Sequence, residues 1–303
     1  MPKKEIIFIV GSGRSGSTIL DMLLGGAENG FSTGEFFRIY DTNSFNSICT
    51  CGQSIANCSV WSHVISHKKN NFSKPKGFLS KLYHFFSVLL YSKLNINLLE
   101  DKYFKFSMNN TELFDKLFEV TAAEVIVDSS KDLLRALTIE RMLKDKYSFK
   151  YIYLTRDAIA QSLSRTKTHY KLRIKGESSK VKKPENIVVS LRKALISWVL
   201  VNLKYIMILK LLNIKYYHLR YRDLVNNTSK LIINFNKITI LKLDNSLSEF
   251  TNRKFHLING NPSRFNAQRI EKRNDFISKK IAFKYKFLFF LSGGWLLNKI
   301  LRH

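Results

Sequence analysis

Short runs of apolar residues recur along the chain and predict the strands of a parallel sheet. Residues 6–10 (IIFIV), 124–128 (EVIVD), 151–154 (YIYL) and 216–220 (YYHLR) are such runs, and a shorter strand with a turn is expected at 31–37. Strands that are apolar at nearly every position suit a sheet that is covered on both faces.

Helical spacing of apolar residues fills the intervals between these runs. Helices are predicted over residues 18–24, about 77–118, 133–143, from 157, and 187–212. Strands that alternate with helices indicate an α/β fold, in which a parallel sheet forms the middle of three layers and helices flank it. The carboxyl ends of the strands are where ligands of such folds bind.

The composition favours one domain. The chain has 303 residues, 45% of them apolar, with only 4 Pro and 13 Gly, so long linkers are not expected. We therefore expect a single domain over residues 1–303. It would carry a helical and cysteine-containing insertion at about 42–120 and a C-terminal helical segment at about 275–303.

The net charge of the chain indicates a class of binding partner. The chain has 50 Lys and Arg against 23 Asp and Glu, a formal net charge of +27. Such an excess indicates an anionic partner, which includes nucleotides, nucleic acids, membrane surfaces and polyanionic substrates. Lysines on solvated faces explain part of the excess equally well. Residues 281–301 mix aromatic residues with lysines and suit either an anionic membrane surface or a terminal core helix.

The N-terminus and the cysteines indicate the compartment. The apolar run at 6–10 is too short for a signal peptide and leads into a glycine-rich turn, as a first strand would. No uncharged stretch reaches the roughly 20 apolar residues of a spanning helix. Three cysteines without a signal peptide favour a reducing compartment. We expect a cytoplasmic protein, either free or peripheral at the inner membrane face, and the sequence leaves its oligomeric state open.

The segment GSGRSGST at residues 11–18 lies between the first predicted strand and helix. Backbone N–H groups and the helix dipole bind phosphate in this context. The spacing nearly fits the nucleotide-hydrolase pattern G-x-x-x-x-G-K-[ST], but Ser17 occupies the lysine position and Arg14 supplies a cation three residues earlier. Because a kinase or NTPase needs that lysine and a metal for its β- and γ-phosphates, the loop suits a nucleotide with a shorter, less charged tail.

The same loop resembles the 5′-phosphosulfate loop of sulfotransferases that use 3′-phosphoadenylyl sulfate (PAPS). Residues 151–165 (YIYLTRDAIAQSLSR) resemble the family's 3′-phosphate motif, with Arg156 at a strand end and Ser164 eight residues later. Four further segments are similar to family elements in the family's order: CTCGQSIANCSVW at 49–61, VDSSK at 127–131, LRYRDL at 219–224 and HLINGNPSRF at 256–265. The resemblance is to the bacterial carbohydrate and tyrosylprotein branch and implies its P-loop-NTPase-like sulfotransferase fold. Arg222 stands where that family has Glu.

The resemblance also implies roles for individual residues. Glu35 would be the general base for the acceptor hydroxyl, and Lys131 with Arg14 would stabilise the departing phosphate. The residues implied for PAPS binding are Gly13, Arg14, Ser15, Gly16, Ser17, Thr18, Arg156, Ser164, Asn261 and Arg264. No metal is expected to be required, because PAPS is already activated and cationic side chains suffice.

The predicted activity is in-line transfer of a sulfuryl group (EC 2.8.2 type) to a hydroxyl of a saccharide, a glycolipid or another cell-surface glycan. Residues 165–193 hold ten Lys or Arg against two Glu and are expected to form a loop near the cleft mouth, either binding an anionic glycan or merely solvated. Two alternatives stay open: a P-loop kinase or NTPase, and a non-catalytic module for nucleic acid. Nucleic acid is not expected, because the usual aromatic RNA-binding motifs are absent from the sequence.

The cysteines allow one further interpretation. Cys49, Cys51, Cys58 and His63 offer three thiolates and an imidazole for zinc, but the C-x-C spacing is tighter than the usual C-x₂₋₄-C. Packed free thiols are the preferred interpretation, so no metal site is predicted.

Overall fold

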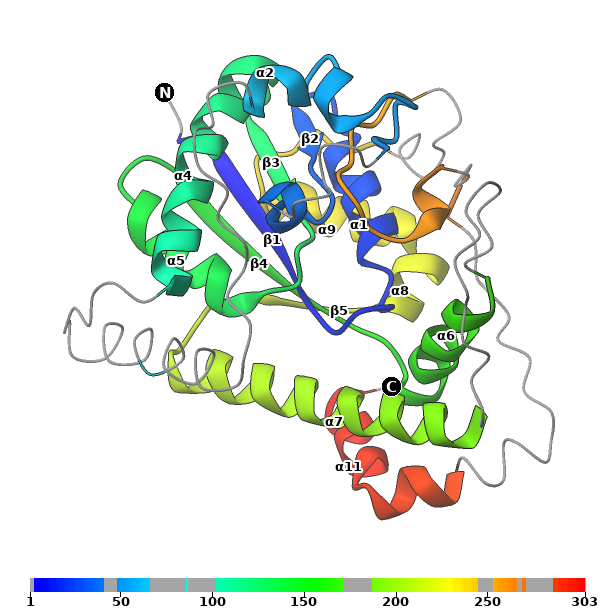
Figure 1. Cartoon of the computed structure of the whole chain (residues 1–303). Helices are drawn as coiled ribbons and strands as arrows, with labels where there is room; N and C mark the ends of the chain where they lie inside the picture. The colour runs from blue at the N-terminus through cyan, green and yellow to red at the C-terminus, as the bar shows by residue number, and fades with distance from the viewer. Residues whose placement is uncertain are drawn as a thin grey trace.

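The computed structural model describes residues 3–40, 48–65, 86, 102–171, 187–244, 253–265, 269–270 and 286–302. Its centre is a sheet of five described strands, all parallel, in the order β2-β3-β1-β4-β5 (Figure 1). The strands are β1 (Glu5–Gly11), β2 (Gly30–Ser32), β3 (Val125–Asp128), β4 (Ser148–Thr155) and β5 (Tyr217–Arg220). The predicted parallel sheet is therefore confirmed, with the first strand of the chain in the middle.

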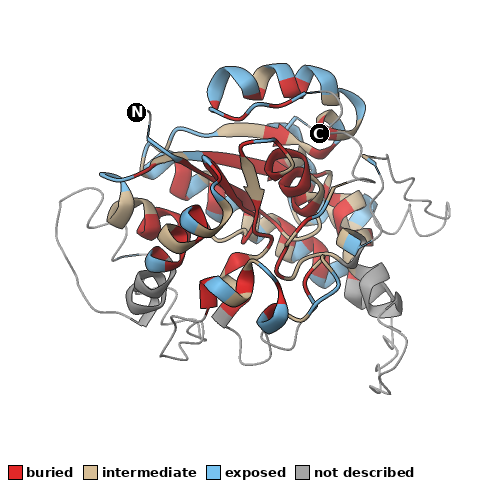
Figure 2. Cartoon of the chain, turned by 90° about the horizontal axis from the view of Figure 1, so that it is seen from above, coloured by how far each residue is buried: buried red, intermediate tan, exposed pale blue. Residues whose placement is uncertain are grey.

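The central strand shows why the chain folds into three layers. All seven residues of β1 are buried. Ile6, Phe8 and Val10 face one apolar cluster, while Ile7 and Ile9 face another on the opposite side of the sheet. Because side chains alternate along a strand, an uninterrupted apolar run places apolar groups on both faces. Figure 2 shows the buried centre between partly exposed helices.

Helices cover both faces of the sheet. One face packs against α1 (Ser17–Gly25), α8 (Tyr221–Asn226) and α9 (Thr228–Ile238). The other packs against α2 (Trp61–Ile65), α4 (Lys102–Thr121), α5 (Leu133–Leu143) and α7 (Ile187–Leu211). Helix α6 (Ala158–Lys171) packs against α7 at an angle, and α11 (Gly294–Ile300) also contacts α7 (Figure 1).

Three predicted segments differ in part from the structure. After β2, residues 33–35 do not continue the strand, and η1 (Phe36–Tyr40) forms a 3-10 helix there. Residues 165–171 and 187–193 belong to α6 and α7, so the basic segment 165–193 is not a loop at its two ends. The helix predicted over 77–118 is described from residue 102, and most of 66–101 lies outside the described residues.

Helix α7 is long and contains two kinds of surface. By length and composition its segment Leu191–Leu211 is apolar enough to cross a membrane, as no other helix among the described residues is. Leu195, Trp198 and Ile208 are buried in the core, as in a core helix of the sheet layer. A second stripe of this helix is exposed and apolar: Ile196, Leu200, Leu203, Met207 and Leu211.

Candidate functional site

Residues 12–16 join β1 to α1 at the carboxyl edge of the sheet. Gly16 has a φ of 101° and Arg14 a φ of 71°, both in the left-handed region. A Cβ on Gly16 would lie 2.5 Å from the ring of Tyr221, so glycine is required by backbone conformation and by space. The first N–H groups of α1 have no partner within the helix. They make the N-terminal end of α1 partly positive, and this end attracts anions at the edge of the sheet.

The loop is held from inside by buried side chains. The Ser15 hydroxyl donates a hydrogen bond to the Ser12 carbonyl (2.8 Å). The Gln161 amide donates to the Ser12 hydroxyl (2.6 Å) and to the Gly13 carbonyl (2.7 Å). Ser15 thus fixes the shape of the loop, and it is not among the residues that line the adjoining cavity.

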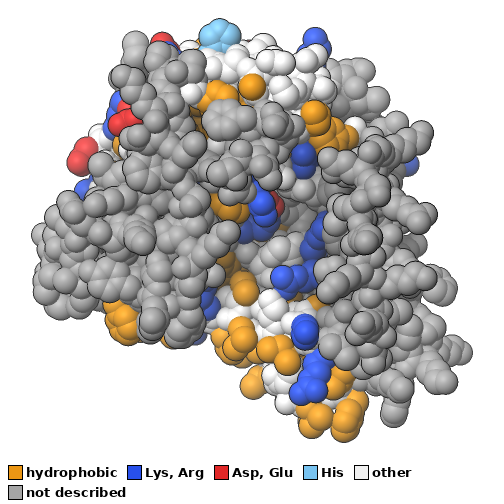
Figure 3. All heavy atoms as spheres, viewed as in Figure 1, with side chains coloured by type: hydrophobic (Ala, Val, Ile, Leu, Met, Phe, Trp, Pro, Cys, Tyr) orange, Lys and Arg blue, Asp and Glu red, His pale blue; other side chains and the backbone are white. Residues whose placement is uncertain are grey.

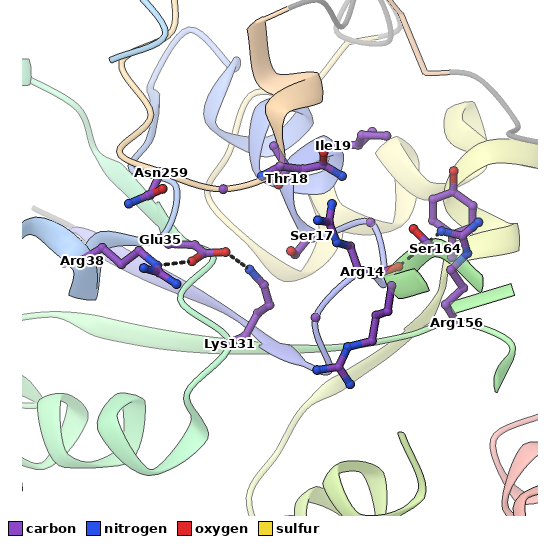
Figure 4. Close-up of a pocket in the computed structure, with 16 residues that line it drawn as sticks. Arg14, Ser17, Thr18, Ile19, Glu35, Arg38, Lys131, Arg156, Ser164 and Asn259 are labelled. Atoms are coloured by element: carbon purple, nitrogen blue, oxygen red, sulfur yellow. Dashed lines mark hydrogen bonds and ion pairs between the residues drawn. The ribbon is translucent and has the colours of Figure 1, made fainter. Parts of the chain in front are cut away.

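A cavity of about 360 Å³ opens over this loop and the start of α1. Most residues predicted to bind PAPS or to act on it line this cavity: Gly13, Arg14, Gly16, Ser17, Thr18, Glu35, Lys131, Arg156, Ser164 and Asn261. Figure 4 shows their side chains around the shared space. They come from five separate parts of the chain, which the fold brings together.

The charges of the cavity favour an anion. Five described cationic side chains line it, whereas Glu35 is the single carboxylate among the described lining residues. The cations are Arg14, Arg38, Lys131, Arg156 and Arg165. On the face shown in Figure 3, Lys and Arg side chains gather around a central hollow. A recess lined by one sign of charge concentrates ligands of the opposite sign.

Glu35 lies between two of these cations. The Lys131 ammonium donates a hydrogen bond to Glu35 Oε1 (2.6 Å), and the Arg38 guanidinium donates to Oε2 (2.8 Å) (Figure 4). Burial alone would raise the pKa of Glu35, but the ion pair and hydrogen bond with Lys131, helped by Arg38, outweigh burial and hold this pKa below its ordinary value. The carboxylate is therefore ionised at neutral pH and can accept a proton.

The backbone on either side of this ion pair is constrained. Gly34 has a φ of 74° and bridges to Ile258, whose carbonyl accepts a hydrogen bond from the Glu35 N–H (2.9 Å). Lys131 has a φ of 60°, and the Tyr205 hydroxyl on α7 donates to its carbonyl. Non-glycine residues in the left-handed region cost free energy and concentrate at functional sites.

The side chain of Asp21 on α1 connects the two segments that carry Glu35 and Lys131. Its side chain is fully buried and accepts hydrogen bonds from the Ser32 hydroxyl (2.6 Å), the Gly34 N–H (2.9 Å) and the Ser129 hydroxyl (2.5 Å). Ser32 ends β2 and Ser129 follows β3, the strands after which Glu35 and Lys131 lie. Burial raises the pKa of Asp21 to about 7, although the hydrogen bonds oppose the rise.

The other end of the cavity is built around Arg156, which follows β4. The Trp198 indole on α7 donates a hydrogen bond to the Arg156 carbonyl (3.0 Å). The guanidinium lies over the Tyr221 ring, 4.3 Å from its centroid, and donates to the Arg14 carbonyl (3.3 Å). Ser164 on α6 lines the same end. Arg156 and Ser164, which the sequence places eight residues apart, therefore line the same cavity.

The C-terminal part of the chain closes one side of the cavity. The Asn261 N–H donates a hydrogen bond to the Thr18 hydroxyl (3.3 Å), and Gly260 has a φ of 118°. Arg264 does not line the cavity; its guanidinium donates to the carbonyls of Gly260 (3.1 Å) and Ile48 (3.3 Å). It therefore shapes the segment that carries Asn261.

Several lining residues were not singled out from the sequence. Arg38 lies three residues after Glu35, and Arg165 directly follows Ser164. Tyr221 lies within the recognised LRYRDL segment, and Asn259 within HLINGNPSRF. The only sequence feature that points to these residues is their position next to the motif residues. Which of them faces the cavity depends on turns and a 3-10 helix that the sequence pattern does not predict.

The three cysteines lie together with His256, whereas the zinc interpretation of the sequence used His63. The Sγ atoms of Cys49, Cys51 and Cys58 and a ring nitrogen of His256 all lie within 4.8 Å of one another. His63 is exposed on α2, where its Nδ1 lies 2.9 Å from the Ser59 carbonyl. His63 is therefore not part of the group that the three cysteines form.

Comparison with known proteins finds a likeness among solved structures. No protein-family model matches the chain, and no curated protein matches it. Among solved structures, the sulfotransferase domain from the Synechococcus PCC 7002 olefin synthase is similar, at 15% sequence identity over 95% of this chain and 94% of that chain, with a TM-score of 0.47. A likeness at this level does not establish a shared activity, so the function has to follow from the residues of the site.

Proposed function

We propose that this chain is a sulfotransferase that moves a sulfuryl group from PAPS to a hydroxyl of an acceptor. The observation that carries the proposal is a cavity with cations at two ends and a carboxylate paired with a lysine beside one of them. The loop and the start of α1 lie in the middle of the cavity, with Glu35 and Lys131 on one side and Arg156 and Ser164 on the other (Figure 4). A donor with phosphate on both its 5′ and 3′ sides matches two separate anion sites.

Particular lining residues match particular groups of the donor. The 5′-phosphosulfate would lie on the loop residues Gly13 to Thr18, where N–H groups and hydroxyls meet the positive end of α1. The 3′-phosphate would accept hydrogen bonds from Arg156 and Ser164. Because Arg156 lies over Tyr221, its planar group is held flat and fixed for two-point binding of a phosphate.

The ion pair of Glu35 and Lys131 supports the transfer step. The acceptor oxygen would form its bond to sulfur as the bond from sulfur to the bridging phosphate oxygen breaks, and the hydroxyl proton would pass to Glu35. Lys131 and Arg14 would stabilise the negative charge that develops on the departing phosphate. As the ammonium turns toward the donor, its hold on Glu35 weakens, and burial then makes the carboxylate a better base.

A P-loop kinase or NTPase fits the site less well. Ser17 occupies the position of the lysine that contacts the β- and γ-phosphates in those enzymes. Glu35, the single carboxylate in the described lining, already accepts hydrogen bonds from two cations. It is a poor ligand for Mg²⁺ in that state, because both oxygens are engaged.

The rim of the cavity supports an acceptor that is itself polar or anionic. Arg38 and Arg165 extend the positive charge beyond the residues assigned to the donor. A saccharide or glycolipid with carboxylate, phosphate or sulfate groups would match this rim, which agrees with the net charge of +27.

Two variants separate the chemical step from donor binding. Glu35→Gln should abolish transfer of labelled sulfate from PAPS to extracted glycan acceptors and leave the affinity for 3′-phosphoadenosine 5′-phosphate unchanged. Arg156→Ala should weaken that affinity in calorimetry. Glu119→Gln and Arg222→Ala, both exposed and outside the cavity, are the matched controls. Transfer at the wild-type rate by Glu35→Gln would remove Glu35 as the base, and unchanged affinity in Arg156→Ala would remove Arg156 from the donor site.

A further inference from the structure

Three thiols and one imidazole meet at a point outside the proposed active site. Cys58 Sγ lies 3.7 Å from the Sγ atoms of both Cys49 and Cys51, and His256 Nδ1 lies 3.1 Å from Cys58 Sγ and 3.9 Å from Cys49 Sγ. Cys49 and Cys58 are completely buried, and Cys51 and His256 are partly buried. His256 is about 200 residues away in sequence, so the fold assembles this group.

These distances match a tetrahedral zinc site. With Zn–S bonds of about 2.3 Å and a Zn–N bond of about 2.0 Å, tetrahedral geometry places two sulfurs about 3.8 Å apart and a sulfur and a nitrogen about 3.5 Å apart. The two short sulfur–sulfur distances are both 3.7 Å, and the two sulfur–nitrogen distances, 3.1 and 3.9 Å, bracket the ideal value. Three thiolates with one imidazole form a recognised ligand set for structural zinc.

A disulfide explains the cluster less well. A disulfide needs sulfurs at about 2.05 Å, and all three cysteines are free thiols in this structure. A disulfide would join two of the three sulfurs and leave the third thiol and the imidazole without a role. Packing alone does not account for the group either, because a polar imidazole nitrogen points into a set of sulfurs.

The ligands are held by hydrogen bonds from their surroundings. The cysteines lie on a tight turn, where the Cys49 N–H donates to the Gln53 carbonyl (2.8 Å) and Gly52, with a φ of 90°, donates to the Cys49 carbonyl (2.9 Å). The Trp61 indole donates to the His256 carbonyl (2.6 Å). Such fixed surroundings orient ligands before a metal binds.

Thr50 joins the two ligand segments directly. Its hydroxyl donates to the Phe255 carbonyl (2.6 Å) and accepts from the Leu257 N–H (2.9 Å), so it binds the residue on each side of His256. The cysteine turn and the histidine segment are therefore attached to each other by the hydrogen bonds of the Thr50 side chain as well as by the cluster.

We propose that Cys49, Cys51, Cys58 and His256 bind one Zn²⁺ ion as a structural site. Each of the three thiols releases its proton to solvent as the metal binds, and the neutral imidazole contributes the nitrogen lone pair. Because all four tetrahedral positions are taken by protein atoms, the site stabilises the fold and leaves no position for a substrate.

The site joins the cysteine turn to the wall of the cavity. Two residues after His256, the Ile258 carbonyl accepts the Glu35 N–H (2.9 Å) and the Ile258 N–H donates to Thr33 (2.9 Å). Asn259 and Asn261 of the same segment line the cavity. Loss of the metal would therefore loosen the segment next to Glu35, a consequence for catalysis that rests on the proposed function, whereas metal binding itself does not.

The metal content of purified protein tests the site independently of any activity. After dialysis under reducing conditions, elemental analysis should give about one zinc per chain for the wild type and for His63→Ala, the matched control from the same region. Cys58→Ser and His256→Ala should lose most of the metal. Zinc retained in both variants, or lost to the same extent in His63→Ala, would overturn the assignment of ligands.

A measurement on the wild-type chain tests the site even if the variants do not fold. Metal-free protein, prepared with a chelator and a reductant, is titrated with Co²⁺. We expect thiolate-to-cobalt charge-transfer bands and the intense visible bands of tetrahedral Co²⁺, both removed by one equivalent of Zn²⁺. We also expect thermal unfolding to move to higher temperature with Zn²⁺. Octahedral or absent cobalt bands together with unfolding that Zn²⁺ does not change would refute the site, whatever the outcome of the sulfuryl-transfer assays.

Discussion

Replacement of Asp21 by asparagine should change how the stability of the protein depends on pH. The Asp21 carboxyl is fully buried and accepts three hydrogen bonds, from Ser32, Gly34 and Ser129. An asparagine can place its oxygen where two of these donors meet and direct its amide toward the Ser32 hydroxyl. The variant should therefore keep the packing and the network and remove only the titration.

The expected size follows from the pKa of Asp21, which burial raises from the ordinary 3.8 to about 7. At about 1.4 kcal/mol for each pKa unit, this difference corresponds to about 4 kcal/mol. The folded state holds the proton over a range in which the unfolded chain has lost it. The contribution to stability is therefore full below 3.8 and is lost as the pH rises through about 7. About 2.5 kcal/mol of it should disappear between pH 5 and pH 8.

Urea unfolding at several pH values between 5 and 8, followed by circular dichroism, measures this contribution. The useful quantity is the difference in unfolding free energy between wild type and Asp21→Asn at each pH. Glu5, with a pKa that burial raises to about 7, and His218, with one that burial lowers to about 4, titrate in both proteins and cancel. Parallel pH profiles for the two proteins would refute the reasoning, because Asp21 would then not take up a proton on folding in this range.

Three further changes test other parts of the structure. Gly16→Ala should weaken binding of 3′-phosphoadenosine 5′-phosphate about tenfold in calorimetry. The added Cβ lies 2.5 Å from an aromatic ring, and for alanine a φ of 101° costs about 1–2 kcal/mol. An unchanged dissociation constant would contradict this. Trp198→Phe should lower the unfolding free energy by about 1–3 kcal/mol, because the Arg156 carbonyl loses its indole donor. Trp295→Phe, at an exposed position, is its control, and equal losses in the two would show that the hydrogen bond contributes nothing. Leu200→Glu, on the exposed apolar stripe of α7, should leave the unfolding free energy within about 0.5 kcal/mol of the wild-type value, because that side chain is solvated in the folded chain, and a loss of several kcal/mol would contradict its exposure.

Much of the fold was predictable because its signals are local. The run at 6–10 predicted the central strand, and the helix predicted over 133–143 has those bounds in the structure. The turn between β1 and α1 was predictable because its glycine spacing and the helix that follows identify it without tertiary information, and phosphate binding by this turn stays a prediction. Residues recognised by resemblance, such as Glu35 and Arg156, do line one cavity.

The remaining features depend on contacts between distant parts of the chain. Asp21 appears in the sequence as one polar position in an amphipathic helix, and its role follows only from the positions of β2 and β3 beneath it. His256 could not be paired with the cysteines from spacing, because His63 was nearer in sequence and equally suitable chemically. Ser15 and Arg264 carry the right chemistry for phosphate, but the local chain turns their hydrogen bonds toward backbone carbonyls.

Helix α7 has a consequence for how the protein forms during synthesis. Trp198 and Tyr205 hold the carbonyls of Arg156 and Lys131, so two segments made earlier are fixed by a helix made later. The ribosome adds about 5–20 residues per second. For the seconds before α7 emerges and docks, β1, β3 and β4 can pair while the Arg156 end of the cavity still lacks its hydrogen bond from Trp198. A ligand that needs the Arg156 end of the cavity therefore cannot stabilise the nascent sheet, which depends on its own apolar contacts until α7 has docked.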